Sequence, residues 1–376
     1  MTTPRLVINL SKISENARRL IKLLGSRGIS VSAVTKATMG LPSVAHILVE
    51  AGVSSLADSR LENIQTILQA GIKAPITLIR SPKIDQAAQV VRDTTMSLNT
   101  ELEVISALSK AAKISGQNHD VLLMVELGDL REGIMPCDLE EFVSQTLLFP
   151  NITLKGIGAN LACRCGISPD DTNMSELSNI ADKIEATFGP VLPIISGGNS
   201  SNLNWALGSK DIGRINNLRI GEAILLGCEP LHRLPIKGLH TDAITLVAEV
   251  IESKLKPSKP WGKAAEAAFG VTNPPCDIGP VFQSILAMGH MDTDPEGLTP
   301  PSGINIIGAS SDHLIIRADQ GYLPIGTEIC FQINYSSLIR AMASPFVSKQ
   351  TIAASLNFVD RGNSLQCDQL CWPCVN

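Results

Sequence analysis

The sequence predicts an α/β protein made of a (β/α)8 barrel of the TIM type followed by a smaller C-terminal β-domain. Strand-like apolar runs alternate with helical periodicities over about the first 230 residues, which is the rhythm of parallel α/β folds. Beyond Leu231 the helical period gives way to short alternating segments interrupted by Pro, Gly and Asp, as in antiparallel β-domains. The length of 376 residues suits one large domain and one smaller one.

Eight runs in the first part have the apolar composition of buried parallel strands. They are residues 30–36, 53–59, 75–81, 95–100, 120–127, 152–161, 191–199 and 217–227. Eight such strands, most of them followed by a helix, match the number that closes a barrel. A doubly wound open sheet is the alternative arrangement for the same alternation.

Helical periodicities fill the intervals between these runs. Clear examples are residues 43–52, 59–71, 100–116 and 174–189. Ser59 and Thr100 occupy the positions where N-caps are expected. Glycines stand where these helices should end, and they are Gly52, Gly71, Gly116 and Gly189.

These patterns divide the chain into three segments. We expect a cofactor-binding barrel over residues 1–230, a β-domain over 231–350 and a poorly ordered tail over 351–376. The short strand 5–10 precedes the barrel rhythm and fits either of the first two units.

Composition excludes several classes of function. The formal net charge of −5 is spread along the chain and aromatic residues make up only 3%, which argues against a nucleic-acid partner. No apolar run reaches the roughly 18 residues of a membrane span, so we expect no membrane partner. The N-terminus lacks the apolar core of a signal peptide, which predicts a cytoplasmic location.

The nine cysteines are irregularly spaced, which favours reduced thiols over a disulfide framework. Cys367, Cys371 and Cys374 have spacings that also occur in iron–sulfur and redox motifs. Such motifs normally need a surrounding α/β structure, whereas these residues lie at the end of the chain. We therefore expect no metal or redox function in the tail.

In a barrel of this type the chemistry takes place where the strands end, at their C-terminal face. The ends of the predicted strands supply a set of polar candidates: Lys36, Asp58, Arg80, Asn99, Glu126, Arg131, Asn160, the turn 196–200 and Arg219. Lys36 is the most unusual of them, because it places one cation directly after a buried apolar run.

Two other members of this set are chemically specific. The turn Ser-Gly-Gly-Asn-Ser-Ser (196–201) leads into a helix beginning near Asn202, and its glycines, hydroxyls and helix N-terminus together predict a phosphate site. An ordinary βα turn is the alternative. Arg219 lies in an apolar strand and needs an anionic or acceptor partner. A structural ion pair with Glu222 is the alternative to a ligand.

The order of these motifs resembles the alanine racemase superfamily of pyridoxal phosphate enzymes, fold type III. A lysine closes the first barrel strand, a Gly-Ser-rich turn closes the seventh and an Arg-x-Gly motif closes the eighth. The segments RIGEAILLG, SGGNSSNL, GANLAC and IIGASSDHLI look most like the ornithine racemase-like branch. The resemblance implies a pyridoxal 5'-phosphate-dependent amino-acid racemase, an isomerase, with a small amino acid as substrate.

The resemblance also implies a role for each barrel residue. Lys36 would form the Schiff base with the cofactor aldehyde and then take or return the α-proton. Arg219 would face the pyridine nitrogen, and because a guanidinium keeps its proton the ring would favour proton exchange over transamination. The cofactor phosphate would be held by Ser196, Gly198, Asn199 and Ser200.

Two further barrel residues take roles from the same comparison. Asn160 would lie beside the cofactor, where related enzymes place a histidine that stacks on the ring. Arg131 would face the substrate carboxylate, and a solvent salt bridge with Glu132 or Asp129 is the alternative for it.

Racemisation in this family needs a second acid–base group on the opposite face of the substrate. Related alanine racemases supply a tyrosine from a partner subunit, but the matching stretch here is Gly289-His290-Met291-Asp292. His290 is one candidate, because an imidazole titrates near neutral pH.

The turn Ser311-Asp312-His313 resembles a segment that reaches the neighbouring site, so Asp312 or His313 competes with His290 and Ser311 would contact substrate. A surface-turn role is the alternative for all of them. The resemblance therefore implies a homodimer with shared active sites.

Substrate and reaction type remain open between several readings. The strand-end acids Asp58 and Glu126 would suit a cationic side chain, which favours ornithine or another basic amino acid. A lyase of the D-threonine aldolase type is one alternative. It would need a divalent metal, with Asp312 and His313 as the available ligand pair, whereas the racemase needs none. A non-catalytic cofactor-binding or regulatory protein is the other alternative.

Overall fold

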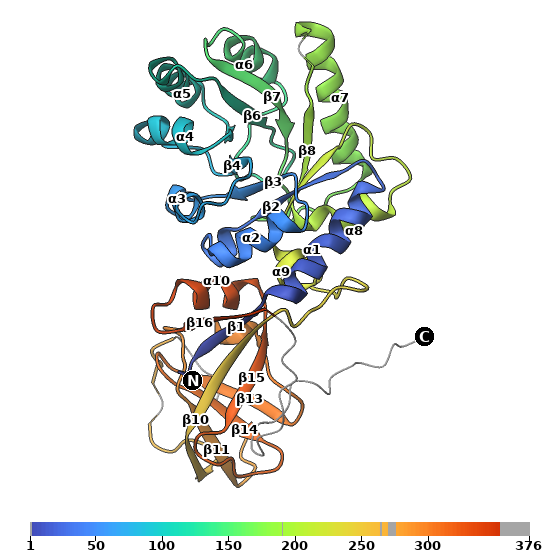
Figure 1. Cartoon of the computed structure of the whole chain (residues 1–376). Coiled ribbons are helices and arrows are strands. Elements are labelled where there is room, and N and C mark those ends of the chain that lie inside the picture. The colour runs from blue at the N-terminus through green and yellow to red at the C-terminus, as the bar shows by residue number, and fades with distance from the viewer. Residues whose placement is uncertain (1, 190, 264, 270–275, 354–376) are drawn as a thin grey trace. The chain divides into compact units, whose positions relative to one another are not determined.

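The computed structural model describes residues 2–189, 191–263, 265–269 and 276–353, and the chain forms two compact units (Figure 1). One unit comprises Lys12–Thr241. The other combines the first eleven residues, Met1–Ser11, with the chain from Asp242 onward.

The first unit contains a closed barrel of parallel strands. In order around the barrel these are β2 (Ser30–Val34), β3 (Ser55–Asp58), β4 (Ile76–Leu78), β5 (Met96–Asn99), β6 (His119–Met124), β7 (Ile152–Gly158), β8 (Ile194–Gly198) and β9 (Asn217–Ile220). The first and last strands close the barrel, with Ser32 aligned to Arg219. Every predicted strand run overlaps one of them, so the barrel prediction is confirmed and the open sheet is excluded.

Helices surround the barrel strands in Figure 1. They are α1 (Leu10–Gly25), α2 (Pro42–Glu50), α3 (Leu61–Gln69), α4 (Ala87–Asp93), α5 (Leu102–Ser115), α6 (Leu139–Thr146), α7 (Asp171–Phe188), α8 (Leu203–Gly208) and α9 (Glu222–Leu226). Buried side chains on α1 recur every three or four residues, at Ile13, Ala17, Leu20 and Leu24, as an amphipathic helix requires.

Local boundaries differ from the predictions in two respects. The N-cap positions of α3 and α5 are Arg60 and Glu101, one residue after the predicted Ser59 and Thr100, and neither makes a side-chain capping bond. The predicted strand 217–227 ends early, because its second half is the helix α9. Apolar composition alone could not separate a short strand from the short buried helix that follows it.

The barrel interior combines an apolar cluster with a close backbone contact. Leu98, Leu122 and Met124 form a buried hydrophobic cluster contributed by β5 and β6. On β7, a Cβ atom added to Gly156 would lie 1.8 Å from the carbonyl oxygen of Ile194. Glycine is therefore required there for β7 and β8 to pair.

A buried histidine lies at the start of β6. His119 is 1% exposed and its Nε2 lies 2.8 Å from the Ser97 hydroxyl oxygen. Burial lowers the pKa of His119 to about 4, because an imidazolium loses its hydration there and gains no carboxylate partner.

The second unit is an antiparallel sheet with one parallel pair. Its strands are β1 (Arg5–Asn9), β10 (Ile244–Pro257), β11 (Pro280–Leu286), β12 (Leu298–Thr299), β13 (Ile304–Ala309), β14 (Leu314–Ala318), β15 (Glu328–Ile333) and β16 (Ser348–Ile352), with the helix α10 (Tyr335–Ala343). The strand β1 pairs with β10 and with β16, so the predicted strand 5–10 belongs to this sheet. Arg5 links it to β15 through two bonds of 2.7 and 2.6 Å to the Glu328 carboxylate.

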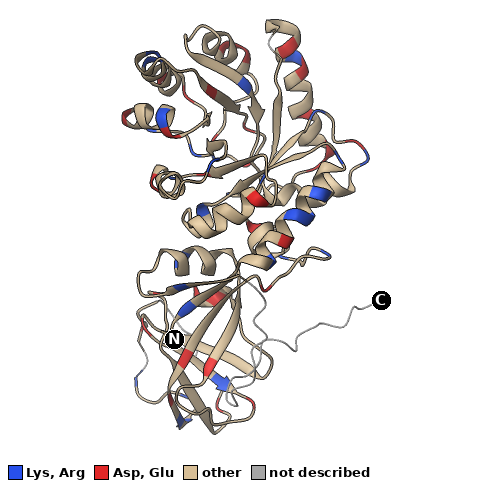
Figure 2. Ribbon diagram, viewed as in Figure 1, with Lys and Arg blue, Asp and Glu red and all other residues tan. Residues whose placement is uncertain are grey.

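The end of the chain is described only in part. The strand β16 includes Thr351 and Ile352, and the predicted tail from residue 354, with Cys367, Cys371 and Cys374, lies outside the described residues. Among the residues that are described, no helix has the length and apolarity to cross a membrane. Acidic and basic residues are interspersed over the outer helices of the barrel (Figure 2).

The β7–β8 contact predicts a large difference between two glycine substitutions. Gly156→Ala should lower the free energy of unfolding by at least about 2 kcal/mol, because the added methyl group overlaps backbone atoms. Gly25→Ala, at the end of α1 where a Cβ meets nothing within 4 Å, should leave stability unchanged or slightly raised. Urea denaturation of both variants measures this, and equal losses would contradict the contact.

The buried His119 predicts acid sensitivity of the fold. Its folded pKa lies below that of the unfolded chain, so the unfolded state binds the proton first as the pH falls from about 6.5 to about 4. Over that pH range the free energy of unfolding of the wild type should fall by up to roughly 3 kcal/mol relative to that of His119→Gln. Denaturation at pH 7 and pH 4.5 measures the difference, and His46→Gln on the exposed face of α2 is the control. Parallel pH profiles for wild type and His119→Gln would refute it.

Candidate active site

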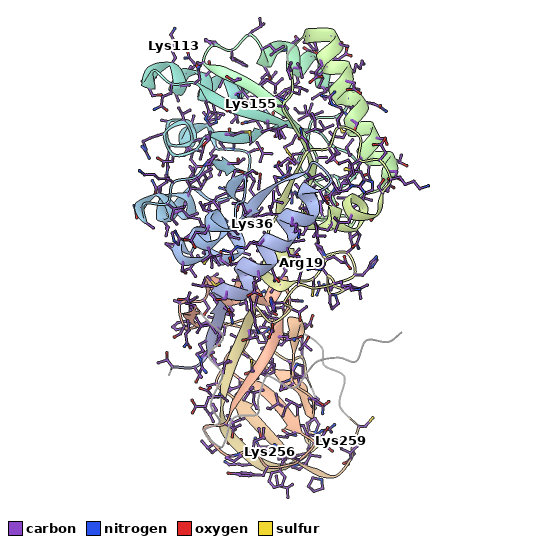
Figure 3. The ribbon with its side chains drawn as sticks, turned by 45° about the vertical axis from the view of Figure 1, so that its right-hand side comes forward. Arg19, Lys36, Lys113, Lys155, Lys256 and Lys259 are labelled. Atoms are coloured by element: carbon purple, nitrogen blue, oxygen red, sulfur yellow. The ribbon has the colours of Figure 1, made fainter. Side chains whose placement is uncertain are left out.

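Lys36 is held at the C-terminal end of β2 by the residue before it. The strand ends at Val34, and the Thr35 hydroxyl donates 2.7 Å to Asp58 Oδ2 at the end of β3. Lys36 itself begins a single 3-10 turn, Lys36–Thr38, and is exposed at the barrel rim, where Figure 3 labels it. A fixed main chain therefore carries an exposed lysine side chain at the C-terminal face of the barrel.

Asp58 fixes the main chain before Lys36 through its bond to Thr35. It is fully buried and its Oδ1 accepts bonds of 3.0 Å from Arg60 N and from Asn63 Nδ2. Burial raises the pKa of Asp58, and the hydrogen bonds from Thr35 and Asn63 oppose that rise. The predicted use of Asp58 for a substrate ammonium group is therefore not supported by its contacts.

Arg219 is almost completely buried on β9, with 6% of its surface exposed. Its Nη1 donates to the Ser196 hydroxyl and its Nη2 donates 2.7 Å to the Ala159 carbonyl. A longer contact of 3.5 Å joins Nη2 to Asn160 Oδ1. The alternative ion pair with Glu222 is absent among the described contacts, so the guanidinium has only uncharged hydrogen-bond partners.

This environment lowers the pKa of Arg219 but leaves the guanidinium charged at neutral pH. Burial lowers its pKa to about 10, with a smaller opposing influence from Glu132 and Cys163. A buried guanidinium with neutral acceptors still prefers an electron-rich partner. The site therefore offers a cation that can donate to a neutral nitrogen or oxygen of a ligand.

Ser196 lies below the predicted phosphate turn, within the polar part of the barrel. It is 1% exposed, and its hydroxyl donates 2.8 Å to Asn217 Oδ1 while accepting from Arg219. Asn217 Nδ2 continues to the hydroxyls of Ser32 and Ser30 on β2, at 3.0 and 3.1 Å. The contacts of Ser196 thus point to Arg219 rather than to a phosphate.

The rest of the turn is built around two asparagines. Gly198 adopts a φ of +147°, and a Cβ there would lie 2.2 Å from Asn202 Oδ1. Asn199 uses its side chain within the loop, accepting from Ser201 N at 2.7 Å and donating to Leu161 O at 2.9 Å. These two residues shape the turn instead of presenting free donors.

Ser200 and Ser201 carry the groups that remain for a ligand. The Ser200 hydroxyl accepts long bonds of 3.4 and 3.3 Å from the main-chain N–H groups of Gly221 and Ala223. The Ser201 hydroxyl is buried and has no hydrogen-bond partner among the described residues. Two hydroxyls and two main-chain N–H groups therefore meet where β8 and β9 end, which fits an anion such as a phosphate.

Asn160 lies between Arg219 and this turn. Its Oδ1 also accepts 3.1 Å from Asn199 Nδ2, and its own amide donates 3.0 Å to Cys163 Sγ. The structure therefore brings together Asn160, Ser196, Asn199 and Arg219, as the sequence predicted for a single site.

Glu222 is a half-buried acid beside Lys36 that the strand-end survey did not include. The pairing of β2 with β9 aligns Ala33 with Ile220, so Glu222 follows level with Thr35. Burial raises the pKa of Glu222 to about 7, against the field of Arg233 and Lys36, and Glu229 adds to the rise. No hydrogen bond to its carboxylate occurs within the described part of the chain.

Arg131 forms the predicted alternative contact, a salt bridge with its neighbour Glu132. The strand-end acid Glu126 accepts from the main-chain N–H groups of Gly128, Leu130 and Arg131, the first at 2.7 Å. Glu126 therefore orders its own loop, and the predicted use of this acid for a substrate ammonium group loses support.

Asp129 has a similar structural use. Its carboxylate accepts bonds of 3.0–3.1 Å from the N–H groups of Cys163, Arg164 and Cys165. This links the loop after β6 to the loop after β7, and it places Arg131 near Cys163 and Arg219 electrostatically.

The four remaining candidates belong to the antiparallel unit, where the structure gathers them. His290 N and Met291 N donate to the carbonyls of Ser310 and Ser311, both at 3.0 Å, so the two predicted segments run side by side. The His290 ring stacks on Phe269 with centroids 4.0 Å apart. Asp312 accepts 2.8 Å from the Ser311 hydroxyl, and His313 is exposed on the same turn.

Two residues of the barrel site were missed by sequence reasoning. Asn217 could have been found from its position two residues before Arg219, which places both on one strand face. Glu222 was considered only as a partner for Arg219. Ser201 lies in the predicted phosphate turn but was given no role of its own there.

Comparisons with known proteins show the family of this chain. The family model for the alanine racemase N-terminal domain matches residues 8–230. A lysine racemase from Thermotoga maritima is 36% identical over 352 residues, covering 93% of this chain and 98% of that protein. This chain belongs to the alanine racemase family.

A second relative supports the same family assignment. An ornithine racemase from Acetoanaerobium sticklandii is 35% identical over 355 residues, covering 93% of this chain and 99% of that protein. The family resemblance predicted from the motifs is therefore confirmed.

Solved structures show the same family fold at lower identity. The alanine racemase from Streptomyces lavendulae matches with a TM-score of 0.72 at 16% identity, covering 94% of this chain and 98% of that one. A D-threonine aldolase from Filomicrobium marinum matches with a TM-score of 0.71 at 15% identity, covering 91% and 88%. At these identities the likeness concerns the fold alone.

The raised pKa of Glu222 predicts an unusual dependence of stability on pH. The folded state binds the proton more tightly than the unfolded state, so stability falls as the pH rises from about 4.5 to about 7. Glu222→Gln should therefore be more stable than wild type at pH 8, by up to roughly 3 kcal/mol, and nearly equal to it at pH 4.5.

Thermal and urea unfolding of the cofactor-free protein at both pH values measures this difference. Glu62→Gln, on the exposed face of α3, is the matched control and should show no such dependence. A stability difference between wild type and Glu222→Gln that is the same at both pH values would refute the prediction.

Proposed function

We propose that this member of the alanine racemase family is a pyridoxal 5'-phosphate-dependent racemase of a basic amino acid. The observation that carries the proposal is the combination of two cations on neighbouring strands. Lys36 is exposed after β2, and Arg219 is buried on β9 with only neutral acceptors. The first is suited to proton transfer and the second to holding an unprotonated ring nitrogen.

The residues present fit the cofactor. The Ser201 hydroxyl lacks a partner in a buried position, and Ser200 meets the N–H groups of Gly221 and Ala223. These groups would hold the phosphate, Arg219 would face the pyridine nitrogen, and Lys36 would hold the aldehyde carbon. When bound, pyridoxal phosphate supplies an electron sink that makes the Cα–H bond of an amino acid acidic.

The protein residues then divide the work of racemisation. The Nζ amine of Lys36 takes or returns the proton on one face of the substrate Cα. Arg131, oriented by Glu132, binds the substrate carboxylate. A second group must serve the opposite face, and we assign it to the cluster of His290, Asp312 and His313, with Ser311 as a substrate contact.

The assembly and location are part of the same proposal. We propose a homodimer in which the antiparallel unit of one protomer completes the barrel site of its partner. We place the enzyme in the cytoplasm, and the six described cysteines, none of them in a disulfide, agree with a reducing compartment.

A basic substrate is favoured by two lines of support. The two relatives that match nearly the whole chain are named for lysine and ornithine. Glu222 also gives the rim beside Lys36 a carboxyl group without a hydrogen-bond partner among the described residues. Asp58 is bonded to Thr35 and to the residues that follow it, and Glu126 is bonded within its own loop. Glu222 therefore replaces them as the acid offered to a substrate ammonium group.

The first test is α-proton exchange in heavy water. The protein with pyridoxal phosphate is incubated separately with L-lysine, L-ornithine and L-alanine, and deuterium at Cα is followed together with the D-form. We expect exchange and D-form accumulation with a basic amino acid. Lys36→Ala should lose activity by a factor on the order of 10² to 10⁴, because the acid–base group is removed.

A binding measurement accompanies the activity. Borohydride reduction followed by peptide mass spectrometry should place a pyridoxyl group on Lys36 of the wild type. Lys113→Ala, a change of an equally exposed lysine at the end of α5, should behave as wild type in both measurements. Cofactor binding without exchange on any of the amino acids would contradict the racemase and favour a non-catalytic binding protein. Aldol cleavage of β-hydroxy amino acids that chelators abolish would favour the lyase.

A further inference from the structure

We propose that Ser196 and Asn217 are positioning residues that hold the Arg219 guanidinium in one orientation and so confine the site to proton exchange. This inference rests on the proposed function. It adds a chain of side-chain hydrogen bonds, called the relay below, that runs from β2 through β9 and β8. Its members are Ser32, Asn217, Ser196 and Arg219.

The register of the strands brings these side chains together. Ser32 on β2 is aligned with Arg219 on β9, and Asn217 on β9 is aligned with Ser196 on β8. Arg219 also reaches the Ala159 carbonyl, which follows β7, and therefore passes the intervening β8. Only the inner side of the barrel allows that path.

The direction of every hydrogen bond in the relay follows from the arginine. A guanidinium can only donate, so the Ser196 oxygen must accept from Arg219 Nη1. The Ser196 O–H is then available for Asn217 Oδ1, at 2.8 Å. This leaves Asn217 Nδ2 facing β2, where the Ser32 hydroxyl oxygen accepts at 3.0 Å. Each member therefore has one orientation that satisfies its neighbours.

Both ends of the guanidinium are anchored by this arrangement. Nη1 is fixed by Ser196, and Nη2 by the Ala159 carbonyl at 2.7 Å. These partners are uncharged, and no described carboxylate accepts a hydrogen bond from the guanidinium. Burial lowers the pKa of Arg219 to about 10, which leaves the guanidinium charged at neutral pH.

The orientation matters because it decides the protonation of the ring nitrogen. A guanidinium held against that nitrogen donates a hydrogen bond without releasing its proton, and the ring remains a weak electron sink. If the guanidinium is free to turn away, water can protonate the nitrogen and a stronger sink results. The competing reaction is transamination, in which amino acid and pyridoxal phosphate give a 2-oxo acid and pyridoxamine phosphate with no other reactant.

The test measures the partition between the two reactions. Wild type, Ser196→Ala and Asn217→Ala are loaded with pyridoxal phosphate and given the racemised substrate, and 2-oxo acid formed per racemisation turnover is recorded. Ser196→Ala should raise this ratio about tenfold, which corresponds to the loss of one hydrogen bond to a charged group. Asn217→Ala should shift it in the same direction by less. The ratio does not depend on the fraction of protein that folds.

A matched control and a second readout keep the inference separable from the proposed function. Ser109→Ala removes a similarly buried serine hydroxyl, 4% exposed, from α5 and should leave the ratio unchanged. The pH dependence of the bound cofactor's absorption band is followed in all variants, and Ser196→Ala should move its midpoint downward by about one unit, because protonation of the ring nitrogen makes the nitrogen conjugated with the ring more acidic. This readout needs no turnover.

The outcomes distinguish the two claims. A wild type that racemises while Ser196→Ala shows the wild-type partition ratio and absorption midpoint overturns the positioning role and leaves the racemase standing. A wild type that binds cofactor without racemising contradicts the proposed function, and the absorption midpoint then decides the positioning role alone. If Ser196→Thr has the wild-type partition ratio and absorption midpoint, the role of the hydroxyl is supported. A wild type that binds no cofactor overturns both the positioning role and the proposed function.

Discussion

A buried guanidinium whose hydrogen-bond partners among the described residues are all uncharged is the constraint on which the polar interior of this barrel depends. Arg219 must donate in several directions from a position with 6% exposure, and the chain supplies a hydroxyl, a main-chain carbonyl and an amide oxygen for it. Burying such a cation is costly unless its hydrogen bonds are satisfied. Serine and asparagine on the neighbouring strands are explained by that requirement, in a layer that most barrels fill with branched apolar residues.

The acids around the rim follow a complementary arrangement. Asp58, Glu126 and Asp129 each accept several hydrogen bonds from their own surroundings, and so they stabilise loops rather than bind cations. Glu222 has no such contacts among the described residues and lies beside Lys36. Near Lys36, the charges that act on Glu222 are those of Arg233, Glu229 and Lys36, whereas Arg131 is paired with Glu132.

In the antiparallel unit, main-chain hydrogen bonds bring together two segments that are distant in the sequence. The loop with His290 and the turn with Ser311 are joined by main-chain hydrogen bonds, so the two competing candidates for the second acid–base group are neighbours. Choosing between His290, Asp312 and His313 then becomes a question about one small cluster. The strand β1, from the other end of the sequence, completes the same sheet.

The sequence by itself determined the barrel and the family, and it singled out Lys36 and Arg219 as candidates. Hydrophobic periodicity and the number of strands can be read from short segments of the chain. Lys36 and Arg219 stand out because each is a charged residue next to or within an apolar run, so no knowledge of tertiary contacts is needed to notice them. Only the tertiary structure decided what the other side chains do. Ser196 faces Arg219 instead of the turn, Asp58 and Glu126 are used by their loops, and Asn217 joins the relay. These assignments depend on strand register and on hydrogen-bond direction, which join residues far apart in the chain and leave no periodic signal in it.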